Sequence, residues 1–198
     1  MASKRDIQDA AYWSRRSQSY EQTWVQRVFH DQIHAAVLNL VAARGTPEVI
    51  VDVGCGTGRL LRRAATRWPD AERIGVDAAS GMIAIARQAT PGAKFYQGAA
   101  ESLPLPDASA DVVLSTISFH HWPDQLQGVR EVSRVLRPGG LFFLADIVPP
   151  AWLAGFSDHL RSNSPEKFRE FMQRANLVVV GEKYHFGIWL QVEIGRRG

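Results

Sequence analysis

The stretch that decides the fold is Val49 to Gly58, which reads V-I-V-D-V-G-C-G-T-G. Its first residues are β-branched apart from one acid, Asp52, and this composition favours a buried strand. Three glycines then stand at alternate positions, Gly54, Gly56 and Gly58. Because glycine adopts backbone conformations that other residues avoid, the pattern predicts a strand that stops in a tight turn.

A helix is expected directly after this turn, because apolar residues recur at helical spacing at Leu60, Ala64 and Trp68. The glycines carry no side chains, so a ligand can approach the backbone closely. The N-terminus of the following helix adds N–H groups that have no acceptor within the helix. The strand, turn and helix together therefore predict a binding site for a polar ligand.

The composition is that of a folded protein with a substantial core, since 45% of its 198 residues are hydrophobic. The formal net charge is only +3 and no basic stripe is present, which argues against a nucleic-acid binder. A single cysteine excludes an internal disulfide framework and any metal site built from several cysteines. We find neither a signal peptide nor the run of about 18 apolar residues that a transmembrane helix needs. A cytoplasmic protein is expected.

The densest basic cluster lies on the helix expected after the glycine turn. A solvated outer face is the favoured interpretation of this cluster, and phosphate binding is the alternative. Its members are Arg59, Arg62, Arg63 and Arg67.

Residues 1–45 are expected to form a helical cap. Apolar residues recur every three or four positions from Thr23 to Ala43, which is the pattern of a helix that lays one face on a domain. Gly45-Thr46-Pro47 breaks the pattern, so residues 46–198 are expected to form one ligand-binding domain. Tyr12 to Tyr20 contains aromatic and arginine residues without a clean period, and we predict that it is a flap over the site.

Strand-like and helix-like segments alternate downstream. Strands are expected at residues 73–76, 94–97, 111–115 and 141–146, and helices capped by Ser80, Asp124 and Ser164. Two consecutive strand-like runs follow, at residues 177–183 and 188–194, with Gly187 at their turn. Alternating βα units predict a doubly wound α/β fold with a mostly parallel sheet and helices on both faces, and the closing hairpin would add an antiparallel edge.

Asp77 follows the second expected strand about twenty residues after the glycines, where an acid can accept hydrogen bonds from both hydroxyls of a ribose. The alternative is that Asp77 only caps the next helix. The glycine spacing discriminates between cofactors, because a dinucleotide site needs G-x-G-x-x-G. Here Gly58 comes one residue too early for that pattern, which disfavours a nicotinamide dehydrogenase.

The segment from Asp52 to Gly58 resembles motif I of the class I S-adenosylmethionine-dependent methyltransferases. Further segments resemble this family in the same order: Asp77, Ala100-Glu101-Ser102-Leu103-Pro104, Ser118-Phe119-His120-His121-Trp122 and Leu136-Arg137-Pro138-Gly139-Gly140. The resemblance is greatest to the small-molecule branch that contains ubiquinone, menaquinone and phospholipid methyltransferases. It implies a Rossmann-like fold whose seven-stranded sheet has the order 3-2-1-4-5-7-6 with the last strand antiparallel.

The resemblance also implies S-adenosylmethionine as the cofactor, S-adenosylhomocysteine as the product, and no metal. It assigns Gly54 and Gly56 to the backbone under the methionine and ribose, and Asp77 to the ribose diol. Met82 would pack on the adenine, although plain core packing is the alternative, and Ser115 would offer its backbone carbonyl to the cofactor ammonium. The other residues assigned to the cofactor site are Tyr20, Asp52, Cys55, Ala78, Ala99 and Ala100. Asp52 is expected to orient the turn.

One position departs from the family pattern. The loop on the adenine side typically reads G-D-A-E, where the Asp accepts a hydrogen bond from the adenine amino group. Here it reads Gly98-Ala99-Ala100-Glu101, so the resemblance implies that the cofactor binds with reduced affinity.

His120 and His121 are the histidines that the resemblance places near the reacting methyl. Since histidine titrates near neutral pH, either could deprotonate a hydroxyl or amine acceptor, although the pair could also only shape the pocket floor. The acceptor would be a small molecule or lipid head group, methylated at O, N or C. The N-terminal segment and residues 149–163, with Trp152 and Phe156, are the expected covers. A non-catalytic S-adenosylmethionine-binding partner is the alternative, and the oligomeric state does not follow from the sequence.

Overall fold

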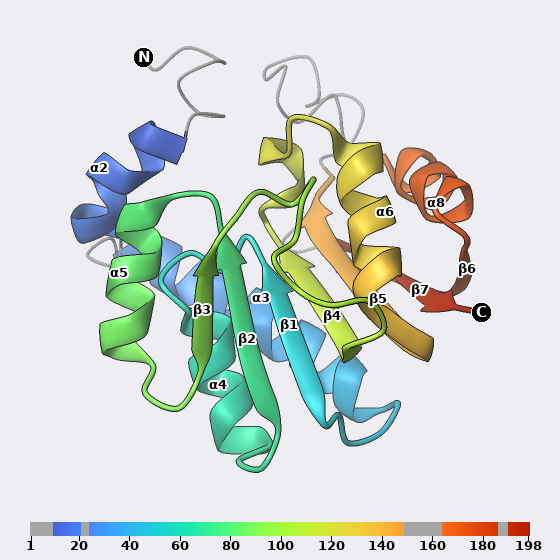
Figure 1. Ribbon diagram of the computed structural model, residues 1–198, viewed down its shortest axis with the longest axis horizontal. Coiled ribbons are helices and arrows are strands. Elements are labelled where there is room, and N and C mark those ends of the chain that lie inside the picture. The colour runs from blue at the N-terminus through green and yellow to red at the C-terminus, as the bar shows by residue number, and fades with distance from the viewer. Residues whose placement is uncertain (1–9, 21–23, 149–163, 186–189) are drawn as a thin grey trace.

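The computed structural model describes residues 10–20, 24–148, 164–185 and 190–198, which form a seven-stranded sheet in the order β3-β2-β1-β4-β5-β7-β6 (Figure 1). The strands are β1 (Val49–Val53), β2 (Glu72–Asp77), β3 (Lys94–Gln97), β4 (Ala110–Thr116), β5 (Leu136–Ile147), β6 (Leu177–His185) and β7 (Leu190–Arg197). Only β7 runs antiparallel to its neighbours, β5 and β6. The expected fold class and strand order are confirmed.

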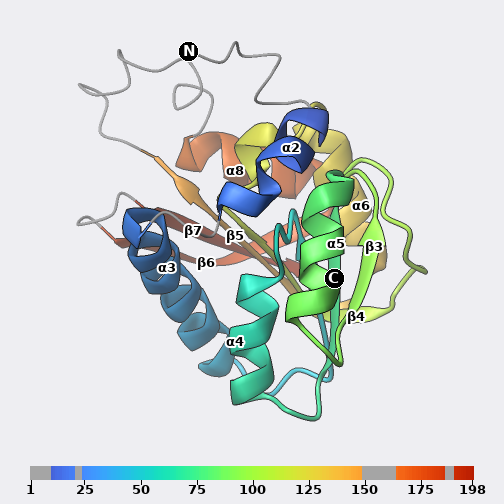
Figure 2. The same cartoon turned by 90° about the vertical axis from the view of Figure 1, so that its left-hand side faces the viewer.

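Helices cover both faces of the sheet. They are α2 (Ala10–Tyr20), α3 (Trp24–Ala42), α4 (Arg59–Arg67), α5 (Ser80–Ala89), the short η1 (Phe119–His121), α6 (Gln125–Val135) and α8 (Pro165–Arg174). Helices α3, α4 and α5 lie on one face, and α6 and α8 lie on the other (Figures 1 and 2). The adjacent residues Phe142 and Phe143 belong to the two opposite apolar clusters, because successive side chains of a strand point to opposite faces.

The expected helix caps agree with the structure in two of three cases. Asp124 accepts a hydrogen bond from the N–H of Gln127 at 3.0 Å, and Ser164 accepts one from Lys167 at 3.2 Å. The prediction that Ser80 caps α5 is wrong, because Ser80 is the first residue of the helix. The turn before α5 is held instead by Asp77, whose Oδ1 accepts a hydrogen bond from the Ala79 N–H at 2.8 Å.

Strand β5 begins earlier than expected, at Leu136, so the Pro138-Gly139-Gly140 turn lies inside it as a bulge. Gly139 has φ of +81°, a left-handed conformation that favours glycine. Strand β7 begins at Leu190, and the predicted turn at Gly187 lies outside the described residues.

Helix α4 is tied to α3 by its arginines. Arg59 and Arg63 each form an ion pair with Asp31 at 2.9 Å, and Arg67 donates to Asn39. Arg62 donates to the Thr57 carbonyl at 2.7 Å. These contacts support a structural role for the basic cluster.

Helix α2 lies across one end of α5 at the carboxyl edge of the sheet (Figure 2). The approach is close, since a Cβ on Gly81 would lie 2.6 Å from the Ser14 carbonyl oxygen. The Gly81 N–H also donates to Ser14 Oγ at 3.2 Å. The missing side chain of Gly81 therefore lets the N-terminal segment dock beside the strand ends, where the predicted flap residues from Tyr12 to Tyr20 form this helix.

Candidate functional site

A pocket of about 310 Å³ opens at the carboxyl ends of β1, β2, β3 and β4, where doubly wound sheets bind their ligands. Its volume is within the usual range for small-ligand sites. Residues from five separate segments line it: Ala10, Trp13, Val53, Gly54, Gly56, Asp77, Ala78, Ala79, Met82, Gly98, Ala99, Ala100, Glu101, Ile117, Ser118, His121, Trp122 and Pro123.

The glycine turn adopts the conformation that its sequence predicts. Gly54, Gly56 and Gly58 have φ of +76°, +51° and +77°, all in the left-handed region. The N–H of Gly54 donates to the Val76 carbonyl at 2.8 Å, which ties the turn to the end of β2. A Cβ on Gly54 would lie 2.4 Å from Ser118 Oγ, so the turn also packs directly on the segment after β4.

Asp77 connects the turn to the start of α5. Its Oδ2 accepts the Gly56 N–H and its Oδ1 accepts the Ala79 N–H, both at 2.8 Å. Burial raises the pKa of this carboxyl, and the two backbone hydrogen bonds oppose that rise in part. Asp77 thus holds the turn that leads into α5 without capping the helix itself, and it also lines the pocket.

Asp52 and Cys55 lie behind the pocket and do not line it. Asp52 is buried in β1, and its Oδ1 has no hydrogen-bond partner among the described residues. Burial, together with the nearby charge of Asp77, raises the pKa of Asp52 to about 8. Within the described part of the chain no hydrogen bond joins this carboxyl to the turn that it was expected to orient. Cys55 is also buried, and burial raises the pKa of its thiol.

The other residues predicted to contact the cofactor occupy different positions. Met82, Ala78, Ala99 and Ala100 line the pocket. Ser115 does not, because it lies within β4 opposite Leu144, with its Oγ 2.9 Å from Ser118 Oγ. Ile117, with φ of +52°, and Ser118 occupy the lining position instead. Tyr20 is the last residue of α2, and its side chain lies outside the described part of the structure.

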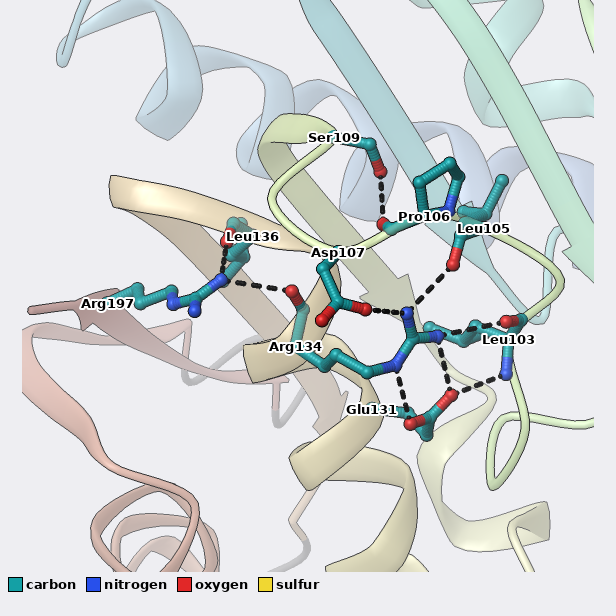
Figure 3. Close-up of polar contacts among 9 residues, drawn as sticks. All are labelled: Leu103, Leu105, Pro106, Asp107, Ser109, Glu131, Arg134, Leu136 and Arg197. Carbon is teal, nitrogen blue, oxygen red and sulfur yellow. Dashed lines mark hydrogen bonds and ion pairs between the residues drawn. The ribbon is translucent and has the colours of Figure 1, made fainter.

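The loop at residues 98–109, which joins β3 to β4, is held by Arg134 of α6 (Figure 3). Its guanidinium donates to the carbonyls of Leu103 and Leu105 at 3.0 and 2.8 Å and pairs with Asp107 at 2.7 Å. Glu131 accepts from both Arg134 and the Leu103 N–H. Side chains from one helix therefore fix a loop that has no strand ladder of its own.

The two histidines occupy different positions. His121 lines the pocket, and its ring meets Trp13 of α2 edge-on at 5.3 Å. His120 does not line the pocket, and its Nδ1 lies 2.9 Å from Asp146, a fully buried carboxylate near the end of β5. The sequence analysis missed Asp146. The signal was present, since Asp146 lies one residue before the end of a buried apolar strand and Asp77 ends another.

Residues 51–144 match a family described as a methyltransferase domain. The chain is 35% identical over 154 residues to a malonyl-[acyl-carrier protein] O-methyltransferase of Dechloromonas aromatica, an alignment that covers 71% of this chain and 57% of that protein. It is 40% identical over 111 residues to a demethylmenaquinone methyltransferase of Deinococcus radiodurans. That alignment covers 54% of this chain and 46% of that protein. The domain is that of a class I S-adenosylmethionine-dependent methyltransferase.

The methyltransferase fold extends over nearly the whole chain. A Thermotoga maritima protein described as a possible histamine N-methyltransferase superposes with a TM-score of 0.74, covering 96% of this chain and 100% of its own. The two sequences are 21% identical, so this likeness concerns the fold. The chain spans about half the length of the two curated relatives. No helix within the described residues is long and apolar enough to cross a membrane.

Proposed function

We propose that this methyltransferase transfers the methyl group of S-adenosylmethionine to an O, N or C atom of a small molecule or lipid head group. The observation that carries this proposal is the pocket itself, which joins a left-handed glycine turn, a half-buried strand-end carboxylate and an alanine-lined slot. S-adenosylmethionine supplies an already activated methyl, so the protein needs only to bind, orient and exclude water.

The residues present fit this cofactor. Asp77 offers carboxylate oxygens to a ribose diol, and the open backbone at Gly54 and Gly56 admits the ribose and methionine portion. Met82 and the small side chains of Ala78, Ala99 and Ala100 leave room for a flat purine. The partnerless Oδ1 of Asp52, directly behind the turn, marks a place where a bound water would be stabilised.

The acceptor would enter beside Trp13, His121 and Trp122, which line the pocket on the side of α2 and η1. Their aromatic rings favour a flat or apolar acceptor and the sulfonium charge. Residues 149–163, the second expected cover, lie outside the described residues. We further propose a cap of residues 1–45 on a catalytic domain of residues 46–198, a cytoplasmic location, and no role for metal or nucleic acid.

Calorimetry with S-adenosylhomocysteine and with NAD tests the cofactor, and an acceptor screen with labelled methyl donor tests the reaction. We expect the calorimetry to show binding of S-adenosylhomocysteine but not of NAD. We expect the acceptor screen to show transfer of the labelled methyl group to a small acceptor. Binding without transfer to any acceptor would instead support the non-catalytic partner. Binding of NAD in preference would contradict the proposal.

A further inference from the structure

The ring of His120 is held by a carboxylate that belongs to a different element. Nδ1 of His120 lies 2.9 Å from both oxygens of Asp146, and the backbone N–H of His120 donates to Asp146 Oδ2 at 3.1 Å. The N–H of Ile147 donates to Oδ1 of the same carboxylate at 2.8 Å. Asp146 is fully buried and held by several bonds, so it fixes both the position and the orientation of the imidazole.

This arrangement leaves the other ring nitrogen available. An ionised carboxylate only accepts hydrogen bonds, so Nδ1 of His120 must carry the proton that it shares with Asp146, and in the neutral ring Nε2 keeps its lone pair. No hydrogen bond to Nε2 is present in the described residues, and the side chain of His120 remains 13% exposed. An imidazole fixed in this way accepts a proton at one defined atom.

His120 and Asp146 lie close to the pocket. His120 follows β4 and Asp146 lies near the end of β5, so both are at the edge of the sheet where the pocket opens. The His120 ring centroid is 3.9 Å from that of His121, which lines the pocket. The pair therefore adjoins the side of the pocket where an acceptor would enter, away from Asp77 and the alanine slot.

We propose that His120 is the general base of the methyl transfer and that Asp146 is its positioning residue, so that the acceptor atom is a hydroxyl oxygen or an amine nitrogen that carries a proton. This inference rests on the proposed function and narrows its acceptor class. In the step, the acceptor lone pair forms a bond to the methyl carbon. The bond from that carbon to sulfur breaks with its electron pair on sulfur, which becomes a thioether. The acceptor proton passes to Nε2 of His120, and the Asp146 carboxylate balances the imidazolium charge.

The electrostatics agree with this assignment. Burial lowers the pKa of His120, but the charge of Asp146 and the hydrogen bond to it raise the pKa, and the net direction is upward. The other titratable groups around η1 include His121 beside it, Tyr12 of α2 next to Trp13, Glu101, which lines the same pocket as His121, and Asp124 and Lys167 at the starts of α6 and α8. Since the base must be unprotonated, turnover should rise with pH through a value above the ordinary histidine pKa.

The test compares His120→Gln and Asp146→Asn with wild type, and Asp70→Asn, at an exposed aspartate in the turn before β2, is the matched control. Labelled methyl donor is offered to hydroxyl, amine and carboxylate acceptors. General-base catalysis contributes about 10²- to 10⁴-fold, so His120→Gln should lower kcat by about 100-fold or more, with KM and S-adenosylhomocysteine affinity within about threefold of wild type. Asp146→Asn should lower kcat and move the acidic limb of the pH profile to lower pH. Asp70→Asn should match wild type.

A histidine NMR titration of the S-adenosylhomocysteine complex gives a readout that does not need turnover. The pKa of His120 should fall in Asp146→Asn and stay unchanged in Asp70→Asn. The base assignment alone fails if wild type transfers methyl groups and His120→Gln keeps more than about a tenth of kcat, or if only carboxylates are methylated. If wild type binds S-adenosylhomocysteine but methylates nothing, the proposed function fails and the base assignment fails with it.

Discussion

The two sides of the pocket are built in different ways. The side where we propose that the cofactor binds, called the cofactor side, is formed by the turn at residues 54–58, Asp77 and the loop at residues 98–101, all at or just after strand ends and close together along the chain. The side where we propose that the acceptor enters, called the acceptor side, is formed by α2, η1 and the end of β5, and joins Trp13, His121 and Asp146 from distant parts of the chain.

This difference shows where each side obtains its specificity. The cofactor side depends on backbone shape, with left-handed glycines and a carboxylate that binds two N–H groups. The acceptor side depends on side chains that meet only after folding, such as Trp13 on His121 and His120 on Asp146. Substitutions on the cofactor side should therefore change stability and cofactor affinity, whereas those on the acceptor side should change turnover.

The largest expected effect tests the backbone shape of the cofactor side. Gly54→Ala and Gly139→Ala place a Cβ at nearly the same φ, +76° and +81°. Only the Cβ at Gly54 meets a neighbour, Ser118 at 2.4 Å, while the Cβ at Gly139 meets nothing within 4 Å. We expect Gly139→Ala to lower the free energy of unfolding by about 1 to 2 kcal/mol, and Gly54→Ala by about 1 to 3 kcal/mol more, in urea titrations. Equal losses of unfolding free energy in the two variants would show that contact with Ser118 does not destabilise Gly54→Ala.

Asp77→Ala tests whether the cofactor side is anchored by one carboxylate. Hydrogen bonds to a charged group contribute about 1.5 to 3 kcal/mol each, so losing the ribose anchor should weaken S-adenosylhomocysteine binding by roughly 30-fold or more in calorimetry. Asp111→Ala is a suitable control, because Asp111 pairs with Arg137 at the opposite edge of the sheet. A change under about threefold in Asp77→Ala would remove the anchor assignment.

Asp52 makes the stability of the cofactor side depend on pH. Burial holds its pKa at about 8 in the folded chain, above the ordinary value of 3.8, so the folded state binds this proton more tightly than the unfolded state does. The resulting stabilisation is fully present below about pH 4 and is lost as the pH rises to 8. We expect the free energy of unfolding to fall between pH 5 and pH 8 by an amount on the order of 1 to 3 kcal/mol more in wild type than in Asp52→Asn. Parallel pH profiles for the two proteins would contradict this.

The smallest expected effect concerns the missing adenine acceptor. Ala99 lines the pocket where the pattern of the family that the sequence resembles has an aspartate, so Ala99→Asp should tighten S-adenosylhomocysteine binding several-fold and leave acceptor preference unchanged. Glu101 also lines the pocket and accepts the Asp124 N–H at 3.0 Å. If Ala99→Asp binds no better, then Glu101→Gln should weaken binding, which would identify Glu101 as the adenine acceptor.

The doubly wound sheet, the glycine turn and the strand-end position of Asp77 could be predicted from local patterns, such as β-branched residues before glycines or an acid at a strand end, because neighbouring parallel strands place such ends at one edge. The strand order and the alanines of the pocket were implied by the resemblance to a known family. Ser80 was expected to cap α5 but is its first residue, and Ser115, which the family resemblance assigned to the site, lies within β4, which continues to Thr116.

The sequence by itself determined the doubly wound sheet, and it determined the glycine turn and the strand-end carboxylate that line the pocket. The tertiary structure decided which histidine binds Asp146 and which one lines the pocket, how closely α2 approaches α5 at Gly81, and which face of the pocket Trp13 covers. These contacts join residues between 26 and 108 positions apart along the chain, such as His120 with Asp146 and Trp13 with His121. No local period or spacing encodes them, because they depend on where two separately formed elements come to rest against each other.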